Sequence, residues 1–325
     1  MTADTQILTA LRAVPGGLSA ADLAERVGLT RATLQTRLDG LRALGYGLES
    51  SPHRGCRLVS APDVLHADDL LSRLGATRVI GRDIRVFQET TSTNDVAEKL
   101  ARDGVKEGVV VFAEAQSQGR GRFRRKWVSP ARQGLWFSVL LRPRLPLQAM
   151  SQLTVAAATA LVRAIRHQIP VTPQIKWPND LLLNGRKCAG ILTEVKGEPD
   201  SVRHAILGIG VDVNLTSDEF PPDLRRLATS LRAEVGQLID RPALAAQMLR
   251  ELDRDYDRIC AGRFEEVAEE WEQLCTTIGR RIVVRVGDRR IEGCAEALDS
   301  DGALRLRTQH GHLERVTGGD ITVEK

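Results

Sequence analysis

The sequence predicts an α+β protein made of three successive regions. Residues 1–62 alternate short amphipathic helices with tight turns, residues 63–275 alternate apolar strands with helices, and residues 276–325 contain only short strands. Strands that alternate with helices indicate a mixed sheet backed by helices, whereas a run of short strands favours a small barrel. We therefore expect a helical N-terminal domain, a central sheet domain and a C-terminal SH3-like β-barrel.

The first region has the pattern of a winged helix-turn-helix. Apolar residues at helical spacing predict one helix that ends at Pro15 and a second helix capped by Ser19. After a tight turn at Gly28, Thr30 is expected to cap a third helix, 31–44. Residues 47–59 have the pattern of a β-hairpin, the wing, with its turn at 51–55.

The polar face of the third helix is the candidate DNA-binding surface. Its side chains would enter a major groove: Arg31, Thr33, Gln35, Thr36 and Arg37. The electrostatic support is weak, because residues 1–62 contain 7 Lys or Arg and 5 Asp or Glu. A winged helix used for protein contacts or dimerisation is the alternative. We favour DNA binding by a dimer, because one small module rarely makes enough contacts for specificity.

Composition indicates a cytoplasmic protein with neither a zinc site nor a membrane span. The five cysteines are scattered, without a Cys-x-x-Cys pair or a histidine at ligand spacing, which favours reduced thiols over disulfides. The N-terminus lacks the features of a signal peptide, and no apolar run reaches roughly 18 residues. The net charge of +4 permits a nucleic-acid partner without requiring one.

The central region contains the patterns of a sheet and its covering helices. Apolar runs predict strands at 84–87, 109–112, 135–141, 174–183, 186–194 and 205–214. Helices are predicted at 65–74, 148–167, 241–261 and 263–274, with a further amphipathic helix that follows residues 89–95 and ends at Ala101. The run 205–214 contains Gly208-x-Gly210, but Val213 stands where a dinucleotide fingerprint needs its third glycine, so a Rossmann fold is rejected. Beyond it, the C-terminal barrel is too small to carry chemistry alone and is expected to be a lid or a docking surface.

The segment EAQSQGRGRFRRKW, residues 114–127, joins two buried-type strands. Gly119 and Gly121 alternate with Arg120 and Arg122, which predicts a loop that wraps an anion. Glycine permits unusual backbone conformations, and arginine forks match carboxylate and phosphate oxygens. A solvated basic loop, or a patch that touches nucleic acid, is the alternative.

Two further clusters of polar residues could belong to the same site. Residues 91–94 place four hydroxyl or amide side chains where a helix begins, although a cap needs only one of them. Asn184-Gly185 predicts a hairpin turn that brings Asp180 and Lys187 to similar heights on paired strands. A simple cross-strand salt bridge is the alternative to two groups acting on one ligand.

Together these motifs resemble those of the biotin protein ligases. They are T-S-T-N at 91–94, E-A-Q-S-Q-G-R-G-R with R-K-W at 114–127, K-W-P-N-D at 176–180, R-K-x-A-G-I-L at 186–192 and G-I-G-V-D-V-N at 208–214. The winged helix makes the chain similar to the bifunctional members that also repress the biotin operon. The resemblance implies a central domain related to the class II aminoacyl-tRNA synthetases.

The resemblance also implies a reaction in two steps. The carboxylate of biotin attacks the α-phosphorus of ATP to give biotinyl-AMP, and a lysine of the biotin carboxyl carrier protein of acetyl-CoA carboxylase then attacks that anhydride. The implied cofactor is Mg²⁺, and the implied partners are the carrier domain, operator DNA and, once the adenylate is bound, a second copy of the chain, with no membrane. Because the carboxylate is already ionised, the site has to supply charge neutralisation rather than a base.

Residue roles follow from the same resemblance. The catalytic set is Arg120, Arg122, Lys187 and Asp180, with Asp180 near Mg²⁺ or the incoming amine. The biotin-binding set is Ser92, Thr93, Asn94, Gln116, Gly119, Arg120, Gly121, Arg122, Lys187, Gly190 and Gly208. The ATP-binding set is Arg122, Arg125, Lys126, Trp127, Asn179, Lys187, Gly210 and Asn214.

Three residues depart from the family pattern. Arg124 stands where members often have glycine, Asp212 where asparagine is usual, and Thr91 where aspartate is common. We expect these departures to affect loop ordering and nucleotide affinity. Two other functions stay open at this point: a lipoate-type ligase on the same scaffold, and a repressor that senses biotin without catalysis.

Overall fold

The computed structural model describes residues 1–51, 55–198 and 201–323, and the chain divides into two compact units. Met1–Ala76 and Asp240–Ala246 form the first unit, and the remainder of the chain forms the second. The boundaries 1–62, 63–275 and 276–325 stay a prediction, since compactness groups the C-terminal strands with the central sheet. Each unit is described separately below.

The first unit contains the predicted winged helix. Its elements are α1 (Ala3–Ala13), α2 (Ala20–Val27), α3 (Arg31–Ala43), β1 (Gly47–Ser51), β2 (Gly55–Ser60) and α4 (Ala67–Leu74). The side chains of Ser19 and Thr30 accept the amides of Asp22 and Thr33, so both predicted N-caps are confirmed. β1 and β2 pair antiparallel as the wing, whereas the middle of its predicted turn, 52–54, lies outside the described residues.

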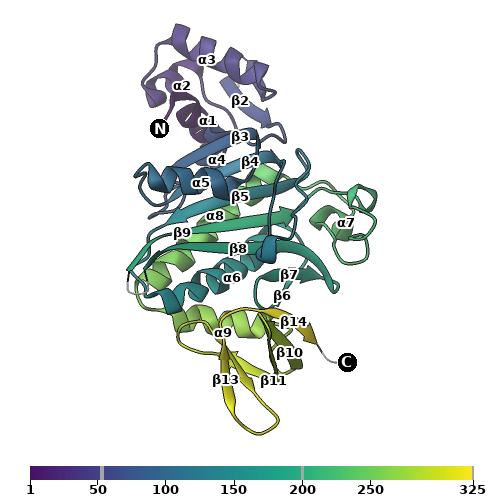
Figure 1. Cartoon of the computed structure of the whole chain (residues 1–325). Coiled ribbons are helices and arrows are strands. Elements are labelled where there is room, and N and C mark those ends of the chain that lie inside the picture. The colour runs from purple at the N-terminus through teal and green to yellow at the C-terminus, as the bar shows by residue number, and fades with distance from the viewer. Residues whose placement is uncertain (52–54, 199–200, 324–325) are drawn as a thin grey trace. The chain divides into compact units, whose positions relative to one another are not determined.

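The second unit is built on a seven-stranded mixed sheet (Figure 1). Its strands are β3 (Asp83–Thr90), β4 (Val109–Gln116), β5 (Gly134–Leu141), β6 (Gln174–Lys176), β7 (Asp180–Leu183), β8 (Arg186–Glu198) and β9 (Ser201–Asp212). They lie in the order β3-β4-β5-β9-β8-β7-β6, and only the pair β3 and β4 is parallel. The predicted mixed sheet is confirmed.

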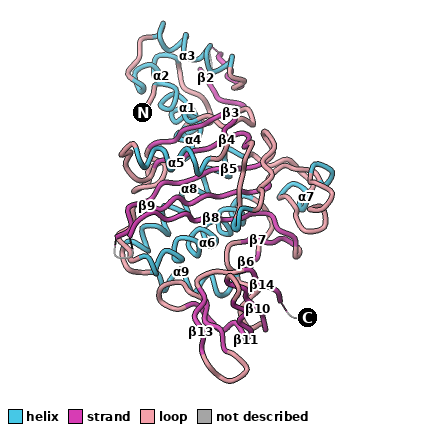
Figure 2. Tube along the Cα trace, in the orientation of Figure 1, coloured by secondary structure: helices cyan, strands magenta, loops and turns pink. Residues whose placement is uncertain are grey.

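The helices α5 (Thr93–Arg102) and α6 (Ser151–Gln168) pack against this sheet, and Figure 2 shows α7 (Leu231–Val235) to one side of it. The chain also forms α8 (Arg241–Cys260), α9 (Phe264–Leu274) and the short 3-10 turns η1 (Arg122–Arg124), η2 (Leu147–Met150) and η3 (Ser217–Glu219). Val109 and Val111 of β4 pack against Ala97 of α5. Val110 and Phe112 alternate with them and therefore point to the opposite face, where they are equally buried. Both faces of β4 are thus closed to solvent.

A five-stranded antiparallel sheet follows at the C-terminus. It consists of β10 (Arg281–Val286), β11 (Arg289–Leu298), β12 (Leu304–Arg307), β13 (Leu313–Val316) and β14 (Asp320–Val323), in the order β13-β12-β11-β10-β14. Ser151 at the start of α6 donates a hydrogen bond to the carbonyl oxygen of Asp301, and Glu272 of α9 accepts the amide of Leu298. These bonds anchor the small sheet to the helices of the central domain.

Two expectations about composition can be compared with the described residues. All five cysteines carry free thiols, as expected from their spacing. Within the described ranges, the helices are too short or too polar for any of them to traverse a lipid bilayer.

Candidate functional site

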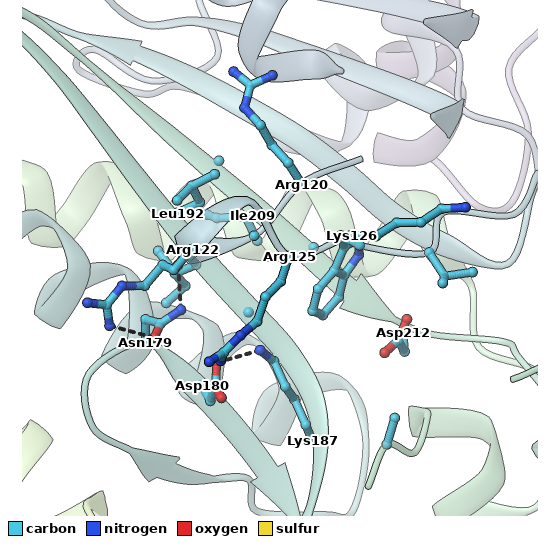
Figure 3. A pocket seen from close by; sticks show the side chains of 18 of the residues that line it. Arg120, Arg122, Arg125, Lys126, Asn179, Asp180, Lys187, Leu192, Ile209 and Asp212 are labelled. Atoms are coloured by element: carbon cyan, nitrogen blue, oxygen red, sulfur yellow. Dashed lines mark hydrogen bonds and ion pairs between the residues drawn. The ribbon is translucent and has the colours of Figure 1, made fainter. Parts of the chain in front are cut away.

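One cavity of about 420 Å³ gathers most of the predicted site residues (Figure 3). The start of α5, the loop 116–128, the β7–β8 hairpin, the middle of β9, the segment 215–228 and the C-terminal sheet all contribute to its lining. The predicted residues that line it are Ser92, Thr93, Asn94, Gln116, Arg120, Gly121, Arg122, Arg125, Lys126, Trp127, Asn179, Asp180, Lys187, Gly190, Gly208 and Gly210.

Two predicted residues lie outside this lining. The buried Asn214 binds the backbone of Ile239 twice: its Nδ2 donates to the carbonyl oxygen and its Oδ1 accepts the amide, each at 3.0 Å. A Cβ at Gly119 would lie 2.5 Å from the carbonyl oxygen of Trp127, so the close packing of the loop on itself requires glycine there. Both residues therefore shape the walls of the site.

The start of α5 forms the polar floor of the cavity. The backbone amide of Thr93 donates to Oε1 of Gln116 at 2.8 Å, and Nε2 of Gln116 donates to Oγ of Ser129 at 2.9 Å. Oγ of Ser138 donates to Oδ1 of Asn94 at 2.6 Å. Side chains held in this way, at a helix N-terminus with its partial positive charge, suit the carbonyl of a buried polar ring.

The strand glycines make room for side chains of the site itself. A Cβ at Gly208 would lie 2.2 Å from Oδ1 of Asn94, and a Cβ at Gly210 would lie 2.6 Å from the indole of Trp127. Real atoms do not approach so closely, so a larger residue at either position would displace Asn94 or Trp127. The glycines of β9 thus bring the floor and the loop against the sheet, whereas the resemblance implied a direct role for Gly208 in binding biotin and for Gly210 in binding ATP.

The glycine–arginine loop, residues 119–127, is a short irregular hairpin. The Gly121 amide donates to the Arg125 carbonyl oxygen at 2.7 Å, and the Trp127 amide donates to the Gly119 carbonyl oxygen at 2.8 Å. The left-handed backbone occurs at Phe123 (φ 55°) and Arg124 (φ 59°). We expected it at the glycines, whose φ angles do not fall in that region.

That backbone conformation carries strain, at about 1–2 kcal/mol for each residue with a Cβ. Glycine has no such penalty, which gives a physical reason for the glycine that the family often has in place of Arg124.

The cationic end of the cavity is organised around the β7–β8 hairpin. Asp180 pairs in register with Gly190, and Lys187 pairs with Leu182, because a bulge between Leu181 and Leu182 shifts the register by one residue. The side chains nevertheless meet, with Nζ of Lys187 2.6 Å from Oδ1 of Asp180, in an ion pair whose angles do not make a hydrogen bond. In Figure 3 the side chains of Arg125 and Lys187 both point toward Asp180.

Arg122 connects the loop to two other parts of the second unit. Its Nη1 lies 3.3 Å from Oδ1 of Asn179 and 3.3 Å from the carbonyl oxygen of Gly319. Gly319 and Ile321 belong to the C-terminal sheet region and line the cavity. The C-terminal sheet therefore forms part of the wall, a contribution that no motif in the sequence signals.

Arg120 points in the opposite direction, away from Asp180 and Lys187 (Figure 3). Its guanidinium donates to Oδ1 of Asp95 at 2.6 Å and to Oε2 of Glu194 at 3.0 Å. Burial would lower the pKa of Arg120, but the hydrogen bonds to Glu194 and Asp95 raise it by more. Neither carboxylate was predicted to belong to the site. Glu194 follows Leu192 by two residues and Gly190 by four, so all three side-chain positions lie on the same face of β8. This alternation could have identified Glu194 as a residue of the site.

An apolar wall faces the indole of Trp127. Leu215 and Phe220 form a buried cluster with Trp136, and Trp127 packs against this cluster. The Nε1 group of Trp127 is buried without a hydrogen-bond acceptor in the described part of the chain. An apolar slot beside an indole suits a flat aromatic ligand, and the buried N–H offers it a donor.

Asp212 lies at the edge of the cavity with an uncompensated carboxyl group. Its residue is 5% exposed, and among the described residues its carboxyl accepts no hydrogen bond. Burial raises the pKa of Asp212 well above its ordinary value, and the positive charge of Lys187 opposes this shift only in part. The raised pKa favours the protonated, neutral form of the Asp212 carboxyl group.

The predicted DNA-contacting side chains occur on α3. Arg31, Thr33, Gln35, Thr36 and Arg37 are all exposed. Arg37 lies 3.9 Å from Asp4, a weak ion pair between exposed groups. The face is thus available for contact, with modest positive charge.

Comparisons with known proteins cover all three regions. Residues 4–57 match an HTH domain, residues 86–212 match the biotin/lipoate A/B protein ligase family, and residues 277–323 match the biotin protein ligase C terminal domain. The chain is 36% identical over 305 residues to the bifunctional ligase/repressor BirA of Bacillus spizizenii, covering 94% of this chain and 93% of that one. The corresponding protein of Escherichia coli is 30% identical, with 94% and 92% covered.

A relative and a solved structure extend the comparison. The biotin–[acetyl-CoA-carboxylase] ligase of Mycobacterium tuberculosis is 36% identical, covering 74% of this chain and 88% of that one. The biotin protein ligase from Aquifex aeolicus in complex with biotin and ATP has a similar fold, with a TM-score of 0.64 and 26% identity. That alignment covers 75% of this chain and 99% of the other.

The state of Asp212 predicts a pH-dependent stability difference. The pKa of Asp212 in the folded chain lies above its unfolded value of about 3.9, so the folded chain binds a proton more tightly than the unfolded chain. The folded chain therefore loses stability as the pH rises from about 3.9 through the folded pKa. Asp212→Asn removes this loss, which amounts to about 1.4 kcal/mol for each unit of raised pKa. In urea unfolding, the variant should exceed the parent chain in stability at pH 8, with the difference shrinking toward pH 4.

The exposed Asp223 provides the matched control for this measurement. Asp223→Asn should change stability equally little at both pH values. A pH-independent difference between Asp212→Asn and the parent chain would contradict the assignment of a neutral, buried acid.

Proposed function

Because this chain belongs to the biotin protein ligase family, we propose that it activates biotin with ATP and transfers it to a lysine of a biotin carboxyl carrier protein. It is a biotin–[biotin carboxyl-carrier protein] ligase that also carries a helix-turn-helix repressor domain. The observation that best supports the residue-level proposal is one cavity with a polar floor at one end and converging cations at the other.

The cavity suits the first step, in which two anions must meet. We place the ureido ring of biotin at the floor of Ser92, Thr93 and Asn94, with its carboxylate directed toward the β7–β8 hairpin. A carboxylate oxygen bonds to the α-phosphorus of ATP while the bond to pyrophosphate breaks. Lys187 and Arg125 would reduce the repulsion between the two anions, and this electrostatic term is commonly the largest part of such catalysis.

The second step requires an uncharged amine from the carrier protein. The lysine arrives as an ammonium and first loses one proton to water. Its nitrogen then bonds to the acyl carbon of biotinyl-AMP, the bond to the AMP oxygen breaks with its electron pair staying on AMP, and the nitrogen loses a second proton to water. Lys187 would stabilise the negative charge on the leaving phosphate. We assign Asp180 to the incoming ammonium, because its carboxylate already pairs with an ammonium, that of Lys187, at 2.6 Å.

The nucleotide base would occupy the slot beside Trp127. The wall of Leu215 and Phe220 gives the slot an apolar surface, and Asp212 lies at its edge. A neutral Asp212 has one hydroxyl donor and one carbonyl acceptor, the pair that an asparagine amide also offers.

Mg²⁺ is proposed as the cofactor, and the residues present fit it. Among the described residues, no three His, Cys, Asp or Glu side chains gather as a metal cage. Mg²⁺ bound to nucleotides commonly takes only one or two protein carboxylates, with phosphates and water as its other ligands. Asp180 is the side chain that would hold it. When bound, Mg²⁺ supplies positive charge to the phosphates.

We propose operator DNA as a second partner, bound by the exposed residues of α3. Two copies of the chain would be needed for a two-fold operator, so we propose a homodimer that forms when the adenylate is bound. The five free thiols support a reducing, cytoplasmic location.

The ligase activity is tested by mass spectrometry of a carrier domain incubated with the chain, biotin and MgATP. We expect one biotin on one lysine, and a loss of roughly 10²-fold or more for Lys187→Ala, the scale for removing a group that stabilises charge in the transition state. Lys106→Ala, at an exposed lysine outside the cavity, is the control and should retain activity. Pyrophosphate release without modification of the carrier, or preference for lipoate in competition, would refute the proposal.

Arg122→Gly should release the reactive adenylate. Arg122 ties the loop to Asn179 and to the Gly319 backbone, so its loss should open the loop and allow biotinyl-AMP to escape. The readout is biotin on the lysines of an added bystander protein, which should rise while carrier labelling falls. Arg124→Gly removes a cation from the same loop at a left-handed position, and it should not cause leakage. Equal bystander labelling by both variants would contradict the role of Arg122.

Ligand binding should order the loop and promote dimerisation. The loop carries five cations between residues 120 and 126, and the negative charge of biotinyl-AMP would reduce their mutual repulsion. We expect slower tryptic cleavage within 120–126 and a shift to dimer in sedimentation when the adenylate is present. Equal cleavage rates with and without it would refute this coupling.

A further inference from the structure

Hydrogen bonds connect the floor of the cavity to both ends of the glycine–arginine loop. From the loop's exit, Ser129 bonds to Gln116, and Gln116 bonds to Thr93 on the floor. Further along the floor, Oγ of Ser138 lies within hydrogen-bonding distance of Thr93 and of Asn94. On the other side of the floor, Glu194 connects Asn94 to Arg120 at the loop's entrance.

Glu194 contacts two groups of different origin. Its Oε2 accepts Nδ2 of Asn94 at 2.6 Å and Nη2 of Arg120 at 3.0 Å, and its Oε1 lies 3.4 Å from the same Nη2. Asn94 belongs to α5, Arg120 to the loop and Glu194 to β8. One carboxylate therefore holds two elements against a third.

The contact with Asn94 decides which way its amide faces. A carboxylate only accepts hydrogen bonds, so it selects the NH₂ end of Asn94, while Ser138 donates to the carbonyl end at 2.6 Å. The carbonyl oxygen of Asn94 is thereby held over Gly208, where a Cβ would lie 2.2 Å away. Without Glu194, the hydrogen bond from Ser138 would still favour this orientation, but a hydroxyl can also accept from the NH₂ end, so the amide would be held less firmly.

The contact with Arg120 fixes the entrance of the loop. Arg120 forms a backbone bridge with Lys126, so holding its side chain also holds the opposite strand of the loop. Asp95 shares this task through Nη1 at 2.6 Å, but it has no bond to Asn94. Asp95 is therefore a natural control, because its carboxylate contacts Arg120 of the loop and makes no bond to the Asn94 side chain.

We propose that Glu194 is a positioning residue for biotin activation, which orients the Asn94 amide on the floor and holds the Arg120 end of the loop with the same carboxylate. This inference rests on the proposed function of the cavity as the biotin site. It adds that recognition of the ligand ring and closure of the loop depend on one group outside the sequence motifs.

Three variants separate the two contacts. Glu194→Ala loses both, Glu194→Gln can still accept from Asn94 but loses its charge toward Arg120, and Asp95→Asn weakens only the contact with Arg120. Each is compared with the parent chain in KM for biotin and kcat during carrier labelling at saturating ATP. Tryptic cleavage within 120–126 is measured without ligand, and thermal unfolding confirms that each variant is folded.

Glu194→Ala should raise KM for biotin about tenfold, which corresponds to about 1.4 kcal/mol, and should lower kcat by less. It should also accelerate cleavage of the ligand-free loop. Glu194→Gln should recover most of the KM but cleave as fast as Glu194→Ala. Asp95→Asn should accelerate cleavage while keeping KM within about threefold, the scale of an exposed ion pair.

Parent-like KM and cleavage in Glu194→Ala would overturn the inference. An equal rise in KM for Asp95→Asn and Glu194→Ala would also overturn it, because Arg120 alone would then account for the effect. If the parent chain itself does not use biotin, the proposed function fails. The ligand-free cleavage rates would still decide whether Glu194 holds the loop.

Discussion

Neutralisation of cations by a few carboxylates is the interaction on which this site depends. The loop carries five positive charges between residues 120 and 126, and Lys187 adds another to the same cavity. Asp180 pairs with Lys187, while Asp95 and Glu194 pair with Arg120. The charge of Arg120 is therefore already balanced at the end of the cavity near Asp95 and Glu194. The end near Lys187 keeps excess positive charge that can attract anions.

Close packing gives that arrangement its precision. The glycines at 208 and 210 let Asn94 and Trp127 lie directly on β9, so the sheet acts as a rigid base for both the floor and the loop. Although the bulge after Leu181 places Asp180 opposite Gly190, the side chains of Asp180 and Lys187 still meet across the strands. The C-terminal sheet then contacts the loop through Gly319. The side chains of the site are therefore held in place by backbone contacts to the sheets as well as by contacts with other side chains.

Much of this was predictable from local patterns. Capping residues and helical spacing located the first three helices of the first unit, and Asn184-Gly185 located the hairpin, because these signals act over a few residues. The motifs also identified most of the cavity lining. They did not identify Glu194 or Asp95, since a carboxylate in a strand or in the first turn of a helix has many ordinary roles on a surface.

The sequence by itself determined the family, the order of the domains and the residue types that meet charged ligands, because these depend on composition and spacing along the chain. Only the tertiary structure decided how those residues are paired. The side chain of Arg120 pairs with Glu194 and does not point toward Lys187. Asn214 holds the backbone of Ile239, and Phe123 and Arg124 adopt the left-handed backbone conformation. Such pairings depend on which segments, distant in sequence, lie within a few ångströms of one another, and spacing along the chain does not encode that distance.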